Sequence, residues 1–252
     1  MTRSKIFAAS FALLFAVGCS KEAEQQAAQN KEPAVEKSKT APVTSSGSGT
    51  ISGKVVFKGA HSVGKLAVGK DKEVCGDSKQ DSSVVVGGDG GLKNAVVQIA
   101  GLHQGKTPSN EALFDQSKCE YVPHVLVVPA GATVTIKNSD GILHNVHTLS
   151  QVNSPFNRAQ PKFMKEIKEQ FAKPEIIPVR CDVHGWMSGW IVVTDNAYFD
   201  VTRSDGAFTL AEVPAGKYSL EVWHETLGSA AQPVEIKNGE TVHVTFEFQM
   251  KK

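Results

Sequence analysis

The stretch from Cys181 to Met187 constrains this chain more than any other part of the sequence. It reads Cys181-Asp182-Val183-His184-Gly185-Trp186-Met187, and so places a thiolate, an imidazole and a thioether in one short segment. One Cys, two His and a weakly bound Met form the ligand set of a blue-copper electron-transfer centre. The second His must come from a distant segment, so the fold has to bring two separate stretches together. The candidate is His144, which follows a strand-like run and an Asn138-Ser139-Asp140-Gly141 turn.

Two other interpretations of Cys181 stay open. A Cys-x-x-His pair could belong to a zinc site, although structural zinc sites bring further Cys or His in tight clusters. No Cys-x-x-Cys pair occurs in the chain. Alternatively, Cys181 could be a disulfide partner. We expect copper.

At these stretches the chain resembles the cupredoxin family. His144-Asn145-Val146 is similar to the family's first ligand segment, and Cys181-x-x-His184-x-x-Met187 is similar to its C-terminal ligand loop, with a spacing closest to amicyanin. The resemblance covers roughly residues 119–194. It implies one type 1 copper held by four ligands, which are His144, Cys181, His184 and Met187.

The resemblance also implies a role for Asn145 next to these ligands. Its backbone N–H is expected to hydrogen-bond the Cys181 sulfur, and its side chain is expected to tie the two ligand segments together. Electrons are expected to pass through an exposed edge of His184. Residues three apart on a strand face opposite sides, so His147 should point away from a metal that His144 faces. We interpret His124 as a hydrogen-bonded structural histidine.

The N-terminus indicates the compartment. Arg3 and Lys5 precede an apolar run over residues 6–17, which is too short to span a bilayer and is typical of a signal peptide. The run ends in Ala16-Val17-Gly18-Cys19, which resembles a bacterial lipobox. The resemblance implies removal of residues 1–18 and lipidation of Cys19. With Ser20 following, we expect a periplasm-facing protein anchored to the outer membrane. Ordinary cleavage nearby, giving a soluble secreted protein, is the alternative.

Residues 19–48 are predicted to form a disordered tether. They are rich in Ala, Gln, Glu, Lys and Ser and contain no aromatic residue. Such a segment cannot bury enough apolar surface to offset its ordering entropy. The formal net charge of the whole chain is +1, too near neutral to suggest a nucleic-acid partner.

The cysteine count predicts one disulfide. Of the 4 Cys residues, Cys19 is assigned to lipid and Cys181 to copper, which leaves Cys75 and Cys119. In an oxidising compartment two remaining thiols are expected to pair. Two free buried thiols or a second metal site are the alternatives.

The rest of the chain predicts an all-β protein. Residues 50–57 alternate between apolar and polar, and turn sequences recur at residues 204–206, 213–216 and 238–239. We also expect strands at residues 83–86 and 94–99 and a loop at 105–117. One short helix is predicted between the copper-ligand segments, at residues 161–172, because Phe163, Ile167 and Phe171 recur every four residues.

A second resemblance divides the chain. Residues 49–55 and 206–220 are similar to the carboxypeptidase regulatory-like (transthyretin-like) β-sandwich. We therefore expect a cupredoxin Greek-key β-sandwich at residues 107–196, inserted into a second small β-sandwich made of residues 49–106 and 197–250. A competing layout gives residues 49–106 to the cupredoxin.

These features together predict a lipid-anchored one-electron carrier and not an enzyme, because the ligand set leaves no open position for a substrate. The expected partners are periplasmic redox proteins: a dehydrogenase, a cytochrome or a reductase. A copper-delivery lipoprotein without redox turnover, and a structural surface protein, are the alternatives.

Overall fold

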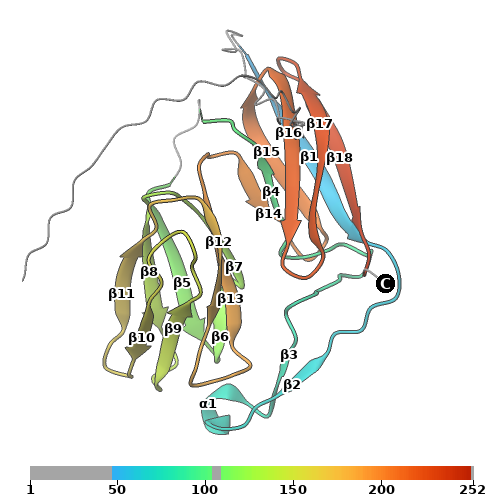
Figure 1. Cartoon of the computed structure of the whole chain (residues 1–252). Coiled ribbons are helices and arrows are strands. Elements are labelled where there is room, and N and C mark those ends of the chain that lie inside the picture. The colour runs from blue at the N-terminus through green and yellow to red at the C-terminus, as the bar shows by residue number, and fades with distance from the viewer. Residues whose placement is uncertain (1–46, 104–108, 251–252) are drawn as a thin grey trace, which may run out of the picture. The chain divides into compact units, whose positions relative to one another are not determined.

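The computed structural model describes residues 47–103 and 109–250, and strands dominate it (Figure 1). The expected all-β class is confirmed. The expected signal peptide, lipobox and nearly all of the expected tether lie outside the described residues. Within the described residues, no helix is long and apolar enough to cross a membrane.

The first sandwich is built from residues 111–194. One sheet has the strand order β10-β9-β12-β13-β7, and the other has the order β11-β8-β5-β6. Their bounds are β5 Glu111–Ser117, β6 Glu120–Val122, β7 Val125–Pro129, β8 Thr133–Asn138, β9 His144–Thr148, β10 Asn157–Gln160, β11 Glu166–Gln170, β12 Glu175–Arg180 and β13 Ser188–Thr194. The alternation of apolar and polar residues along these strands buries one apolar face of each sheet. The shared core includes Phe114, Ile136 and Ile177, all fully buried.

The second sandwich pairs strands from both ends of the described chain. Its sheets have the orders β15-β1-β18 and β14-β4-β16-β17. The bounds are β1 Ser48–Phe57, β4 Val96–Ile99, β14 Phe199–Val201, β15 Ala207–Pro214, β16 Gly216–His224, β17 Gly228–Ile236 and β18 Thr241–Phe248. β1 runs antiparallel to β15 and parallel to β18, and β4 pairs with β14 and β16. Strands more than 90 residues apart along the chain therefore share one core.

Three expectations about local structure are wrong. Residues 161–172 form no helix, because β11 (Glu166–Gln170) pairs antiparallel with β8. Residues four apart share a face in a strand as well as in a helix, so the apolar spacing did not distinguish the two. Phe163, expected on the buried face, is 80% exposed. Residues 83–86 make only an isolated bridge between Val86 and Leu92, and part of the expected loop at 105–117 is β5.

Residues 58–82, which follow β1, form an extended arm. It contains β2 (Lys65–Ala67), the helix α1 (Lys72–Cys75) and β3 (Ser78–Gln80), and β2 pairs antiparallel with β3 (Figure 1). The arm has few buried side chains of its own. Val68 and Cys75 are buried in a small cluster with Cys119, against which Ile142 and Trp186 pack.

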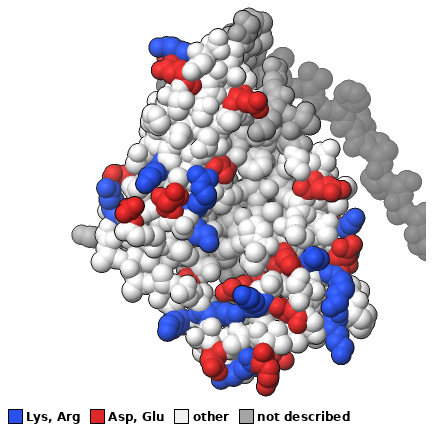
Figure 2. All heavy atoms as spheres, turned by 180° about the vertical axis from the view of Figure 1, so that it is seen from behind, with Lys and Arg blue, Asp and Glu red and all other residues white. Residues whose placement is uncertain are grey.

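Acidic and basic side chains are interspersed on the surface. On the face shown in Figure 2, Lys and Arg lie beside Asp and Glu in mixed groups, separated by wide areas without charge. This mixture agrees with the near-neutral charge of the chain.

Candidate metal centre

Two strand ends bring the predicted ligands together. His144 is the first residue of β9, and Cys181 follows directly after β12. β12 and β9 are antiparallel neighbours in the sheet, with Arg180 opposite His147. The strand ends that carry the ligands therefore lie at the same end of the sheet. His184 and Met187 occupy the loop that leads from Cys181 into β13.

Backbone hydrogen bonds hold this loop in a tight turn. The Cys181 N–H donates to the Met187 carbonyl at 3.0 Å, and the Met187 N–H donates to the His184 carbonyl at 2.9 Å. These bonds bring three residues with donor side chains close together. The geometry follows from short-range backbone pairing, which is why the spacing in the sequence was informative.

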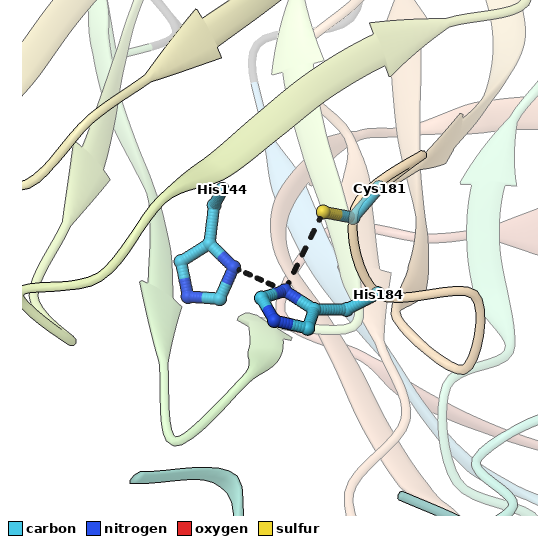
Figure 3. A group of neighbouring side chains, drawn as sticks. All are labelled: His144, Cys181 and His184. Carbon is cyan, nitrogen blue, oxygen red and sulfur yellow. Dashed lines mark hydrogen bonds between the residues drawn. The ribbon is translucent and has the colours of Figure 1, made fainter. Parts of the chain in front are cut away.

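The nitrogen and sulfur atoms converge on one point (Figure 3). His144 Nδ1 and His184 Nδ1 lie 2.9 Å apart, and Cys181 Sγ lies 3.8 Å from His184 Nδ1. One donor atom from each of these residues lies within 4.8 Å of the others. Donors that each sit about 2 Å from one ion are separated by roughly 3–4 Å. The three side chains therefore fit a single metal ion.

The chemistry of the site favours copper among the metals that such a cluster could hold. A thiolate and two imidazoles, with a buried thioether nearby, match the copper set rather than a structural zinc set. Met187 is 2% exposed and belongs to the same apolar core as Cys181. Cys181 is the one free cysteine in the described part of the chain.

Asn145 links the two ligand segments. Its backbone N–H points to the Cys181 sulfur at 3.5 Å. Its side-chain Oδ1 accepts the N–H groups of Asp182 at 2.6 Å and Val183 at 3.2 Å. Its Nδ2 donates to Asn157 Oδ1. The side chain therefore fixes the loop that carries Cys181 and His184 to the strand that carries His144.

Both imidazoles are backed by carboxylates. Asp140 Oδ2 lies 2.8 Å from His144 Nε2, and Asp71 Oδ2 lies 2.9 Å from His184 Nε2. In each ring the outer nitrogen thus contacts an acid, and Nδ1 is left free to face the cluster. Carboxylates in this position fix the orientation of a ligand histidine and raise its basicity. Sequence reasoning noticed Asp140 only as part of a turn and missed Asp71, which has no signal in the sequence.

The expectation that an edge of the His184 ring is exposed is wrong. The His184 side chain is 0% exposed, because Asp71 on the arm covers its Nε2 and Trp186 packs against its ring at 5.0 Å between centroids. The sequence placed His184 at the end of a sandwich, where such an edge is open. The arm, which comes from a distant part of the chain, closes it.

Burial and hydrogen bonding shift the pKa values of the side chains in the cluster. Burial alone would lower the pKa of His144, but hydrogen bonds to Asp140 and Cys181 outweigh it and raise that pKa to about 9. Burial alone would raise the pKa of the Cys181 thiol, but hydrogen bonds from His144 and from backbone N–H groups outweigh it and lower that pKa. Burial lowers the pKa of His184. The lowered pKa of Cys181 favours the thiolate, the form of sulfur that binds metal.

Other histidines lie outside the cluster. His147 pairs with Asp182 at 2.9 Å on the opposite face of β9 from His144. His124 contacts Glu225 Oε1. Both have hydrogen-bonding partners away from the donor cluster.

Cys75 and Cys119 form a disulfide. It joins the arm to the turn that follows β5, and Asp140 Oδ2 accepts the Cys119 N–H at 2.7 Å. The disulfide is therefore connected to the His144 side of the cluster through one carboxylate.

Comparison with known proteins gives partial matches. A family model described as polysaccharide lyase family 4, domain II, matches residues 173–244. No curated protein matches the chain.

Solved structures similar to part of the chain include a cupredoxin, amicyanin and a copper-containing nitrite reductase. A purple cupredoxin from Nitrosopumilus maritimus is 22% identical, with 33% of this chain and 99% of that chain covered at a TM-score of 0.28. A mutant of amicyanin in its reduced Cu(I) form is 23% identical, with 39% and 98% covered at 0.31. A copper-containing nitrite reductase from Thermus scotoductus is 22% identical, with 38% of this chain and 25% of that chain covered at 0.32. This chain thus spans a quarter of the nitrite reductase.

Proposed function

We propose that this protein is a type 1 copper protein that carries single electrons between redox partners. The observation that supports it is the convergence of His144, His184 and Cys181 within 4.8 Å on two neighbouring strand ends. Copper in such a site supplies a one-electron couple between Cu(II) and Cu(I).

The residues around the cluster are suited to this task because they are held before any metal binds. Asn145 fixes the ligand loop, and Asp140 and Asp71 fix both rings. A rigid ligand set has little to rearrange when the charge of the centre changes. Met187 and Cys181 are buried in the sandwich core, which excludes water from their side.

We also propose that the chain is not an enzyme. His144 and His184 are fully buried, and Cys181 and Met187 are each 2% exposed. A substrate would need an open path to the ligand atoms, and these buried side chains leave no such path. The proposed partners are periplasmic redox proteins: a dehydrogenase, a cytochrome or a reductase.

The proposed location rests on the N-terminal sequence. A signal peptide at residues 1–18 and a lipid on Cys19 would hold the protein at the outer membrane, facing the periplasm. Mass spectrometry of the mature N-terminus tests this, since a free Cys19 thiol would contradict it.

In the proposed domain layout, residues 107–196 form a domain that is inserted in the sequence between the two parts of the second sandwich. The pairing of β1 with β18 and of β4 with β16 supports it. Expression of residues 107–196 alone is the test. A truncated chain that fails to fold or to bind copper would contradict the layout.

A visible spectrum with a metal analysis tests the proposed function. Electron transfer predicts one copper per chain and an intense thiolate-to-Cu(II) band that is lost in Cys181→Ser and bleaches reversibly on reduction. The matched control is His147→Gln, which removes an imidazole that pairs with Asp182 outside the donor cluster and should keep the band. A colourless protein that binds only Cu(I) would point to copper delivery, and no uptake of copper would point to a structural protein.

A further inference from the structure

The arm supplies a residue to the metal centre although it lies far from the ligands in sequence. Asp71 and His184 are separated by 113 residues, yet Asp71 Oδ2 lies 2.9 Å from His184 Nε2. The ligand motifs in the sequence do not include this carboxylate. It is the group of the described chain that contacts the outer nitrogen of His184.

Local backbone geometry links Asp71 to the disulfide. Asp71 precedes α1 and has φ 53° and ψ 36°, a left-handed conformation that Asp and Asn tolerate better than most residues. Its carbonyl accepts the N–H of Cys75 at 2.9 Å. One turn of chain therefore connects the carboxylate on His184 to the sulfur that is bonded to Cys119.

Apolar contacts pack the turn that contains Asp71 and Cys75 against the ligand loop. Val68, Cys75 and Cys119 form a buried cluster against which Trp186 packs, and Trp186 in turn contacts the His184 ring. Lys79 on β3 also donates to the Lys118 carbonyl. The arm is thus held to the first sandwich on both sides of the disulfide, and His184 is left without exposed surface.

We propose that Asp71 is a positioning residue of the copper centre and that the arm, anchored by the Cys75–Cys119 disulfide, is a cover over the His184 edge. This inference rests on the proposed copper function. The carboxylate stabilises the more positively charged Cu(II) state through His184, and the cover keeps redox partners from the imidazole. Loss of the disulfide frees the arm and opens the edge.

Exchange of one carboxylate tests the positioning role. Asp71→Asn keeps the shape and the left-handed backbone preference but removes the charge. We expect it to raise the reduction potential by about 59 mV, which is a tenfold change in the equilibrium constant of a one-electron couple. Asp71→Glu should restore most of the wild-type potential.

Asp77→Asn is the matched control. Asp77 lies on the same arm, is 92% exposed, and pairs only loosely with Lys72 at 3.7 Å. The Asp77→Asn substitution makes the same change of net charge but away from His184. The reduction potential of this variant should therefore stay at the wild-type value. Equal potentials for Asp71→Asn and Asp77→Asn would overturn the positioning role.

Two measurements test the cover. The Cys75→Ser/Cys119→Ser variant should oxidise several-fold faster than wild type when its Cu(I) form is mixed with ferricyanide. In the metal-free protein, diethyl pyrocarbonate should modify His184 slowly in the wild type and faster in the variant, as read by mass spectrometry of the His184 peptide. Equal rates in both measurements would overturn the cover.

The experimental outcomes distinguish a failure of this inference from a failure of the proposed function. If the protein takes up no copper, the proposed function fails while the modification of His184 still tests the cover. If copper binds with a thiolate band but neither Asp71→Asn nor the disulfide variant changes the readouts, the inference fails and the function stands. If the disulfide variant does not fold, Asp71→Ala serves in its place in the modification experiment.

Discussion

Asn145 offers the sharpest test of how the ligand site is held together. The residue is 5% exposed, and its side chain accepts two backbone N–H groups from the ligand loop, those of Asp182 and Val183. Asn145→Ala leaves both donors without this partner. Each unsatisfied buried donor costs about 1–3 kcal/mol. Water can reach the exposed Asp182 side of the loop, so we expect the total loss of unfolding free energy to be about 2–4 kcal/mol.

Urea unfolding of the metal-free protein measures this loss, because the midpoint and slope give the free energy directly. The same variant should also bind copper about 10-fold to 100-fold more weakly, as is typical when a partner that orients metal ligands is removed. Competition against a chelator of known affinity measures that second effect.

Asn157→Ala is the matched control. Asn157 is exposed; its Oδ1 accepts from Asn145 Nδ2 and its Nδ2 donates to Asp182 Oδ2. Its loss therefore removes two solvent-accessible hydrogen bonds but keeps the bridge from Asn145 Oδ1 to the loop. We expect a loss of no more than about 1 kcal/mol. If Asn145→Ala loses less than about 0.5 kcal/mol, or no more than Asn157→Ala, the bridge does not hold the ligand segments together.

Two further predictions concern stability. The Cys75–Cys119 disulfide closes a loop with a sequence separation of 44, so the chain-entropy model predicts that Cys75→Ser/Cys119→Ser lowers the unfolding free energy by about 4 kcal/mol; a urea midpoint within error of wild type would contradict this. His224 is 1% exposed, and burial lowers its pKa from 6.5 to about 4. Because the folded protein resists protonation there, its stability is full above pH 6.5 and falls by about 3 kcal/mol as the pH decreases toward 4. Thermal unfolding across that range should show a flatter acid limb in His224→Gln, and an unchanged limb would show that other groups cause it.

The proposed metal ligands could be predicted from the sequence because their chemistry is local. Cys181, His184 and Met187 lie in one loop closed by two backbone hydrogen bonds, so the spacing of the residues carries the geometry. His144 could be added because the ligand set requires a second imidazole and its strand follows a recognisable turn. The period-two alternation in β1 and β18 likewise marked strands with one buried face.

The expected helix over residues 161–172 failed for the converse reason. Ile167 and Phe171 are four apart, which places them on one face of a helix or of a strand. Pairing of β11 with β8 decided between the two, and that contact joins segments about 30 residues apart.

The sequence alone determined the donor set, the all-β class and the supply of two further cysteines in the folded part. Only the tertiary structure decided that Asp71 contacts His184 and that the arm covers the ring. Residue types and short spacings encode which atoms can bind a metal. Which distant carboxylate reaches those atoms depends on how the chain returns to them, and no local pattern records that path.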